Sequence, residues 1–110
     1  MPEIRSIGVV GLGAMGAGIA QLAIEAGYDT IGREVTVELG QAAAARIGHF
    51  LTRKVEKGQL EQGHRDAAVG RLAVTAELED VANCDLVIEA IVEEIEPKTP
   101  LRRARPDLPP

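Results

Sequence analysis

The sequence is poor in aromatic residues and in positive charge, and these shortages argue against one class of partner. Tyr28 and Phe50 are the only aromatic residues, and 12 Lys and Arg face 17 Asp and Glu for a net charge of -5. A surface that binds nucleic acid needs clustered positive charge and usually stacking rings. We therefore expect no nucleic-acid partner.

Cysteine and long apolar runs are also scarce. The single cysteine, Cys84, cannot form an intramolecular disulfide, and its position before a strand is typical of a small buried residue. The N-terminus lacks a basic region, and the apolar stretch after it is interrupted by five glycines, Arg5 and Gln21. We expect no signal peptide, no membrane span and no metal site, and a cytoplasmic location is favoured.

The most informative segment is residues 4–34. An apolar run, Ser6–Val10, precedes a glycine-rich turn and a helical pattern, and the segment Thr30–Glu34 follows. This order predicts a strand, a phosphate-binding turn, a helix and a second strand ending in an acid. Glu34 lies twenty-one residues beyond Gly13, where an acid that binds a ribose is expected.

Each glycine of the turn Gly11-Leu12-Gly13-Ala14-Met15-Gly16 has a physical reason. Gly11 permits the tight turn, Gly13 lets the backbone approach a pyrophosphate, and Gly16 lets the helix pack closely on the strand. The start of the helix then points its free N–H groups at the phosphates. Together with Glu34, the turn predicts a dinucleotide site.

The remaining elements follow from periodicity and from helix-capping residues. We predict a first helix over 14–26 ended by Gly27, and a second helix that begins at the N-cap Thr36 and ends at Gly58. Shorter elements are expected at 60–72 (helix), 73–75 (strand), 78–82 (helical turn) and 85–92 (strand). The predicted apolar faces comprise Ile19, Leu22, Ala23 and Ala26 on the first helix, and Leu39, Ala42, Ala43, Ile47, Phe50, Leu51 and Val55 on the second.

This order of elements predicts an α/β fold, a doubly wound parallel sheet of the Rossmann type with an incomplete second half. The four strands should take the order 3-2-1-4, with 85–92 as an apolar edge strand that would be covered on both faces in a complete sheet. Residues 1–98 would form the dinucleotide-binding domain. Residues 99–110 are rich in proline and arginine and are expected to be a disordered tail.

Three motifs together carry a family resemblance: the segment Gly11–Gln21, the pair Arg33-Glu34, and the strand Asp85–Glu93. The chain resembles the NAD-binding domain of 3-hydroxyacyl-CoA dehydrogenases, especially the 3-hydroxybutyryl-CoA type, over residues 4–98. The resemblance implies that NAD is the cofactor, that Glu34 binds the adenosine ribose, and that Glu93 and Lys98 lie beside the cofactor. It also implies that Lys57 or Lys54 could reach the nucleotide of an acyl-CoA substrate, although a solvated face at a charge-rich helix end is the favoured interpretation of both lysines.

Arg33 raises the question of NADP, because an arginine near this position can bind the additional 2′-phosphate. Glu34 would repel that phosphate, so NAD is the predicted cofactor. The catalytic histidine of the family should follow a later strand, and His49 and His64 are predicted to face solvent on helices. We therefore assign no catalytic residue and expect this chain alone to be inactive, whereas a full-length protein would act on an acyl-CoA, in fatty acid or butanoate metabolism, as a homodimer.

The C-terminal segment departs from the family pattern, which continues after Lys98 as an amphipathic helix. One permissible set of codons for residues 103–109, read one frame over, encodes Ala-Leu-Asp-Arg-Ile-Cys-Pro. This observation leads to the hypothesis that the tail is a frameshift product of a truncated protein. The next few hundred bases of the gene would test it.

Two other functions compete with this interpretation. Dehydrogenases of the 3-hydroxyisobutyrate type also carry Gly-Leu-Gly-x-Met-Gly, but they usually have an Asn-Arg pair in place of Arg33-Glu34. A non-catalytic nucleotide-binding or structural relative, which kept the fold and lost the reaction, is the other alternative.

Overall fold

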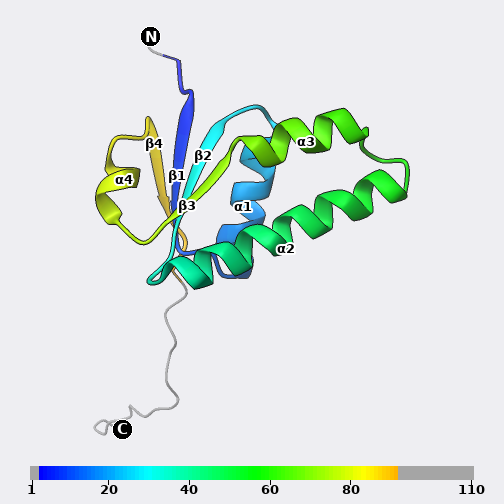
Figure 1. Ribbon diagram of the computed structural model, residues 1–110. Coiled ribbons are helices and arrows are strands. Elements are labelled where there is room, and N and C mark those ends of the chain that lie inside the picture. Colours follow the sequence, from blue (N-terminus) through cyan, green and yellow to red (C-terminus); the bar gives the residue numbers. More distant parts are fainter. Residues whose placement is uncertain (1–2, 92–110) are drawn as a thin grey trace, which may run out of the picture.

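Four parallel strands form one sheet in the computed structural model, which describes residues 3–91 (Figure 1). The strand order is β3-β2-β1-β4, as predicted. The strands are β1 (Ser6–Val10), β2 (Asp29–Arg33), β3 (Leu72–Thr75) and β4 (Leu86–Glu89). The helices are α1 (Ala14–Glu25), α2 (Val37–Glu56), α3 (Gln62–Gly70) and α4 (Leu78–Ala82).

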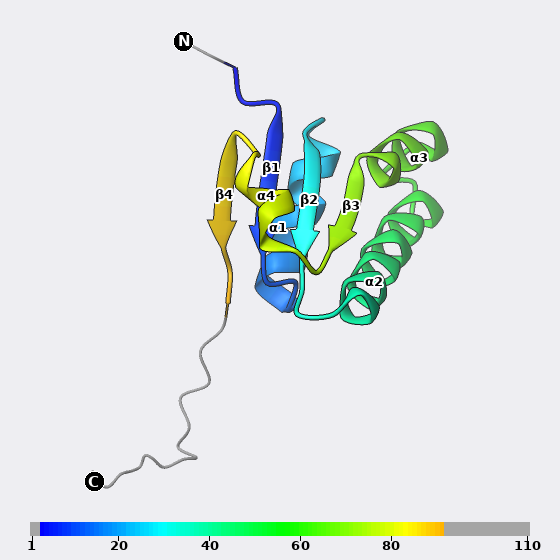
Figure 2. The same cartoon turned by 60° about the vertical axis from the view of Figure 1, so that its left-hand side comes forward.

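The helices cover the two faces of the sheet unequally. The three helices α1, α2 and α3 lie on one face, and the short α4 lies on the other (Figure 2). Because side chains alternate along a strand, Ile7 and Val9 of β1 enter the core beneath α1, while Gly8 faces α4. A Cβ at Gly8 would lie 2.9 Å from the Cβ of Val81, so the glycine allows α4 to pack directly on β1.

The predicted ends of the two long helices are confirmed. The Thr36 side chain accepts a 3.1 Å hydrogen bond from the backbone N–H of Leu39, which satisfies one free donor of α2. Gly27 and Gly58 follow α1 and α2 with φ of 101° and 74°, a conformation that side chains disfavour. These boundaries are local properties of the chain.

The predicted apolar faces of these helices are partly wrong. Leu22 on α1 is 70% exposed and Phe50 on α2 is 51% exposed, and Ala26, Leu39 and Ala42 are exposed as well. Ala23, Ala43, Ile47 and Leu51 are buried as predicted, and small residues join them because α1 and α2 pack closely on the sheet and on each other. The residues buried on these helices are Gly16, Ala20, Ala23 and Ile24 on α1 and Gly40, Ala43, Ile47 and Leu51 on α2.

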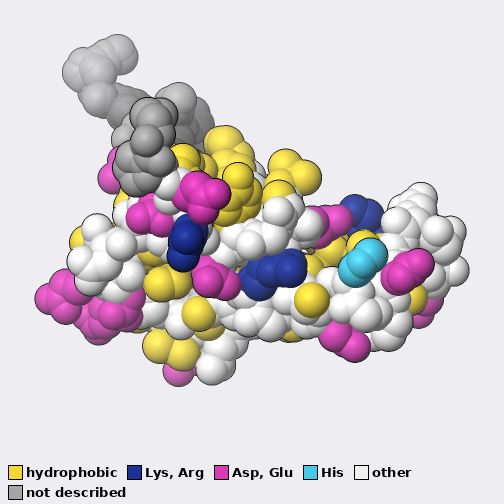
Figure 3. Space-filling model, turned by 90° about the horizontal axis from the view of Figure 1, so that it is seen from above, with side chains coloured by type: hydrophobic (Ala, Val, Ile, Leu, Met, Phe, Trp, Pro, Cys, Tyr) yellow, Lys and Arg dark blue, Asp and Glu magenta, His cyan; other side chains and the backbone are white. Residues whose placement is uncertain are grey.

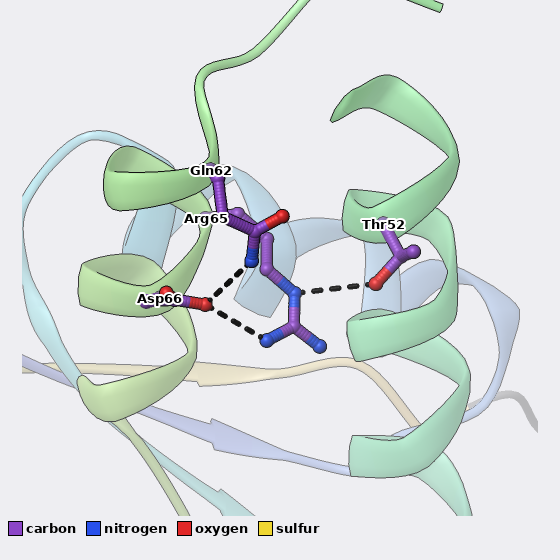
Figure 4. A network of polar contacts seen from close by, with 4 residues as sticks. All are labelled: Thr52, Gln62, Arg65 and Asp66. Carbon is purple, nitrogen blue, oxygen red and sulfur yellow. Dashed lines mark hydrogen bonds and ion pairs between the residues drawn. The ribbon is translucent and has the colours of Figure 1, made fainter. Parts of the chain in front are cut away.

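The helix predicted over 60–72 is shorter at both ends. Leu60 precedes α3 and packs on the core from the loop, and Leu72 begins β3, where it pairs with Thr30 of β2. A polar network fastens α3 to α2 (Figure 4): Arg65 Nε donates to the hydroxyl of Thr52 at 3.2 Å, while Arg65 and Gln62 both donate to Asp66 Oδ1. The hairpin formed by α2 and α3 is therefore held together by these polar side chains as well as by apolar packing.

The fourth strand is also shorter than predicted and is more exposed than expected. Asp85 lies just before β4, and its carboxylate accepts hydrogen bonds from the backbone N–H groups of Arg5 and Ser6 at 2.8 and 3.1 Å. Leu86 and Val87 are 40% and 42% exposed, because β4 is the edge of the described sheet. Position 92, the predicted end of the strand, lies outside the described residues.

Other surface properties of the described residues agree with the composition. Figure 3, which views the sheet from the amino ends of its strands, shows acidic and basic side chains interspersed on that face. No helix within residues 3–91 has the length and apolar character needed to cross a membrane.

Cys84 is half-buried rather than buried, and burial raises the pKa of its thiol. The domain boundary at 98 and the predicted tail fall outside the described residues.

Candidate functional site

A pocket of about 300 Å³ lies where the carboxyl ends of three strands meet. This edge is where parallel α/β sheets bind their ligands. The end of β1 and the glycine turn, the end of β2, and the residues just after β4 each supply part of its wall. The residues that line it are Val10, Gly11, Gly13, Arg33, Glu34, Val35, Ala90 and Ile91.

The glycines of the turn have the geometry that a phosphate site requires. Gly11 has φ of 98° and donates its N–H to the Arg33 carbonyl at 2.9 Å, which ties the turn to β2. Nothing lies within 4 Å of a Cβ built at Gly13, so this backbone faces open space. The open approach at Gly13, which is the N-cap of α1, fits a pyrophosphate.

Gly16 is required for close packing, although its closest partner differs from the prediction. A Cβ at Gly16 would overlap the carbonyl oxygen of Gly11, and it would lie 3.4 Å from the Cβ of Ala90 after β4. The glycine therefore lets α1 pack on the turn itself and on the end of the fourth strand. Packing against the first strand, which we expected, is not its closest contact.

Gly32 is a structural residue of the site that sequence analysis missed. A Cβ at this position would lie 2.6 Å from Cδ1 of Leu12, which is 1% exposed. The absent side chain in β2 leaves the space into which the turn inserts Leu12. A glycine inside the predicted second strand was the available signal, since such a glycine often marks a close approach.

Glu34 lies in the pocket and is bound to the glycine turn. Its Oε2 accepts a 2.6 Å hydrogen bond from the backbone N–H of Leu12, and its Oε1 accepts one of 3.2 Å from Val35 N–H. These bonds hold the carboxylate at the mouth of the turn. The structure thus brings together the acid and the glycine-rich motif, as the spacing predicted.

Two arginines flank the turn. Arg33 lines the pocket, and its Nε donates a 3.0 Å hydrogen bond to the carbonyl of Ala76 in the loop after β3. Arg46 of α2 extends a terminal nitrogen to within 3.5 Å of the Leu12 carbonyl oxygen. Sequence analysis rejected Arg33 as a phosphate ligand, in favour of a side chain extending from the strand edge, and did not consider Arg46.

The two lysines suggested as CoA ligands lie away from the pocket. Lys54 Nζ forms a 2.8 Å ion pair with Glu25 at the end of α1, the opposite end from the glycine turn. Partial burial raises the pKa of Glu25, but the hydrogen bonds from Lys54 and Gln21 outweigh it and leave that pKa below its ordinary value. Lys57 is an exposed C-cap of α2. The structure therefore gives Lys54 a structural partner.

The other residues weighed in the sequence analysis divide into three groups. Ala14 and Met15 are exposed in the first turn of α1, beside the open backbone of Gly13. His49 and His64 are exposed on α2 and α3, as predicted. Glu93 and Lys98 lie outside the described residues. Among residues 3–91 no group of three or more potential metal ligands gathers in one place.

Comparison with known proteins identifies the family. Residues 6–105 match the family described as "3-hydroxyacyl-CoA dehydrogenase, NAD binding domain". The chain is 38% identical over 95 residues to a 3-hydroxybutyryl-CoA dehydrogenase of Bradyrhizobium diazoefficiens, covering 86% of this chain and 32% of that protein. It is 41% identical over 91 residues to the enzyme of the same name from Mycobacterium tuberculosis, covering 83% and 32%.

Solved structures agree with the sequence matches. FadB2 of Mycobacterium tuberculosis superposes with a TM-score of 0.80 at 40% identity, covering 84% of this chain and 33% of that one. The 3-hydroxybutyryl-CoA dehydrogenase of Escherichia coli K12 also gives 0.80, at 30% identity, covering 86% and 20%. The chain spans about a third of the length of the first curated relatives. The chain therefore belongs to the 3-hydroxyacyl-CoA dehydrogenase family and corresponds to its NAD-binding domain.

Proposed function

We propose that this chain is the cofactor-binding part of an NAD-dependent 3-hydroxyacyl-CoA dehydrogenase, which transfers a hydride between NAD and the 3-hydroxyl carbon of the substrate. The observation that carries the proposal is the pocket at the carboxyl edge, where the open backbone of Gly13 and the carboxylate of Glu34 border one space. When bound, NAD supplies the hydride chemistry, and the chain supplies binding and orientation.

We assign the phosphates to the turn and the ribose to Glu34. The backbone from Gly11 to Gly16, including Leu12, Ala14 and Met15, would surround the pyrophosphate at the start of α1. Glu34 would accept hydrogen bonds from the adenosine ribose hydroxyls, and its charge would disfavour NADP. Glu93 and Lys98 remain proposed neighbours of the cofactor, on the family resemblance alone.

The substrate proposal rests on the relatives, because this chain spans only the first part of them. Several of them are named 3-hydroxybutyryl-CoA dehydrogenase, so we propose a short 3-hydroxyacyl-CoA as the substrate of a protein of that length. Homodimer formation and a cytoplasmic location are further proposals for that protein. The domain boundary at residue 98 is likewise proposed.

Two measurements test the function. Titration of NADH and NADPH with the 110-residue chain should show binding of NADH and weaker binding of NADPH. A protein extended to the length of the relatives should oxidise NADH in the presence of acetoacetyl-CoA, whereas the 110-residue chain should not. Cofactor binding without acetoacetyl-CoA reduction by the longer protein would favour a non-catalytic relative, and absence of binding would contradict the proposal.

A further inference from the structure

Arg33 has a geometry that phosphate binding does not explain. It precedes Glu34 at the end of β2 and alternates with Gly32, so its side chain lies on the α4 face of the sheet. Its Nε is occupied by the Ala76 carbonyl at 3.0 Å. The side chain is half-buried and lines the pocket. The Nε edge of the guanidinium is thus held by the protein, while the side chain borders the pocket.

The loop that holds Arg33 is itself fixed from α4. The hydroxyl of Thr75 donates to the carboxylate of Asp80 and accepts a 3.0 Å hydrogen bond from the Glu77 N–H. The carbonyl of Thr75 also accepts a 3.0 Å hydrogen bond from the backbone N–H of Glu34. These bonds place the Ala76 carbonyl without any ligand, so the orientation of Arg33 is set in advance.

The walls around Arg33 indicate what it would contact. Val10, Val35, Ala90 and Ile91 supply apolar surface on the other sides of the pocket. A planar cation beside apolar walls suits a flat aromatic ring, because a guanidinium stacks on aromatic faces. A second phosphate is disfavoured there, since the Glu34 carboxylate is adjacent in the chain and Arg33 has already committed its Nε.

We infer that Arg33 is a cofactor-binding residue whose guanidinium stacks on the adenine ring of the cofactor and does not bind a 2′-phosphate. Thr75 is then a positioning residue, which acts on the ring through the Ala76 carbonyl and Arg33. This inference rests on the proposed function, because it takes the ligand of the pocket to be an adenine dinucleotide.

The test is a titration of NADH, NADPH and ADP-ribose against the 110-residue chain and its variants, with circular dichroism to verify folding. Arg33→Leu should weaken the binding of both NADH and ADP-ribose by about 3- to 30-fold, which is the range that a cation–π contact gives. Arg33→Lys keeps the charge but loses the plane and the Nε bond, so it should recover only part of the affinity. Thr75→Val should cause a smaller loss in the same direction.

Controls separate this inference from its alternatives. Arg53→Leu, on the exposed surface of α2, should leave both affinities unchanged. Inorganic pyrophosphate lacks adenine and would bind the glycine turn, so Arg33→Leu should not alter its binding. A loss confined to NADPH would overturn the stacking role in favour of a phosphate contact, and an equal loss for pyrophosphate would show that Arg33 does not act on the ring. If the unchanged chain binds neither dinucleotide, the proposed function itself fails and the Arg33 assignment fails with it.

Discussion

The carboxylate of Glu34 is bound to the backbone N–H of Leu12 across 2.6 Å, so the acid at the end of β2 and the glycine turn after β1 form one unit. The two residues come from neighbouring parallel strands, whose carboxyl ends lie at the same edge of the sheet. The bond also holds the negative charge where a ribose would approach. Cofactor preference should therefore depend on the charge of Glu34.

Glu34→Gln should weaken NADH binding by about tenfold or more, since a hydrogen bond to a charged group contributes about 1.5–3 kcal/mol. The amide keeps the shape of the side chain, so the fold should be retained. The preference for NADH over NADPH should narrow, because the charge that repels a 2′-phosphate is gone. Parallel titrations of both cofactors measure this change. Tighter binding of NADPH by the unchanged chain would reverse the assignment.

Gly13→Ala and Gly16→Ala form a matched pair that separates ligand binding from folding. The methyl group at position 13 enters open space, so it should reduce cofactor affinity and leave the thermal midpoint nearly unchanged. The methyl group at position 16 overlaps the Gly11 carbonyl and should cost about 1–3 kcal/mol of folding free energy or more. Thermal melts and NADH titrations of both variants measure the difference. Loss of fold in Gly13→Ala would remove support for a phosphate contact.

Asp85 should make stability depend on acid pH. The backbone N–H groups of Arg5 and Ser6 lower the pKa of its carboxyl below the ordinary value near 3.8. The contribution of the Asp85 carboxylate to folding stability is therefore fully present above the ordinary pKa, and it is lost as the pH falls through the lowered pKa of the folded state. Asp85→Asn should lower the thermal midpoint at neutral pH. The difference in thermal midpoint between the variant and the unchanged chain should shrink as the pH falls below the ordinary pKa of the carboxyl. A constant difference at all pH values would contradict this linkage.

The ion pair between Lys54 and Glu25 should stabilise the chain without affecting the cofactor. A double-mutant cycle with Lys54→Met and Glu25→Gln should give a coupling energy of at most about 1 kcal/mol, because Lys54 is partly exposed to solvent. NADH affinity should be unchanged in Lys54→Met, since the pair lies at the end of α1 remote from the turn. A weakened NADH affinity would place this lysine in the cofactor site.

The exposed edge of β4 should cause the 110-residue chain to self-associate. An apolar edge strand offers unpaired backbone groups to a second chain, and Val87 is 42% exposed there. Val87→Lys should reduce association, whereas Leu22→Lys, an equally drastic change on exposed α1, should reduce it less. Sedimentation at several protein concentrations measures the association. A chain that stays monomeric at every protein concentration tested would contradict this prediction.

Local signals predicted much of the fold because their physics is local. The cap at Thr36 and the glycine ends at Gly27 and Gly58 depend on a few neighbouring residues, and the structure confirms them. The exposed Leu22 and Phe50 were placed in the core because periodicity alone does not tell which apolar residue is buried when small residues pack closely. The close approach of α1 and α2 to the sheet, and not the size of each side chain, determined which faces of these helices are buried.

By itself, the sequence determined the order of the elements, the glycine turn and the acid at Glu34, since each follows from backbone geometry or from spacing along the chain, and the strand order followed from the usual winding of such sheets. Only the tertiary structure decided that Gly32 makes room for Leu12, that Gly16 packs on the Gly11 carbonyl, and that Ala76 holds Arg33. These contacts join residues from different elements, and their distances depend on how the strands and loops pack together. A linear pattern carries the types of those residues, but it does not carry the distances between them.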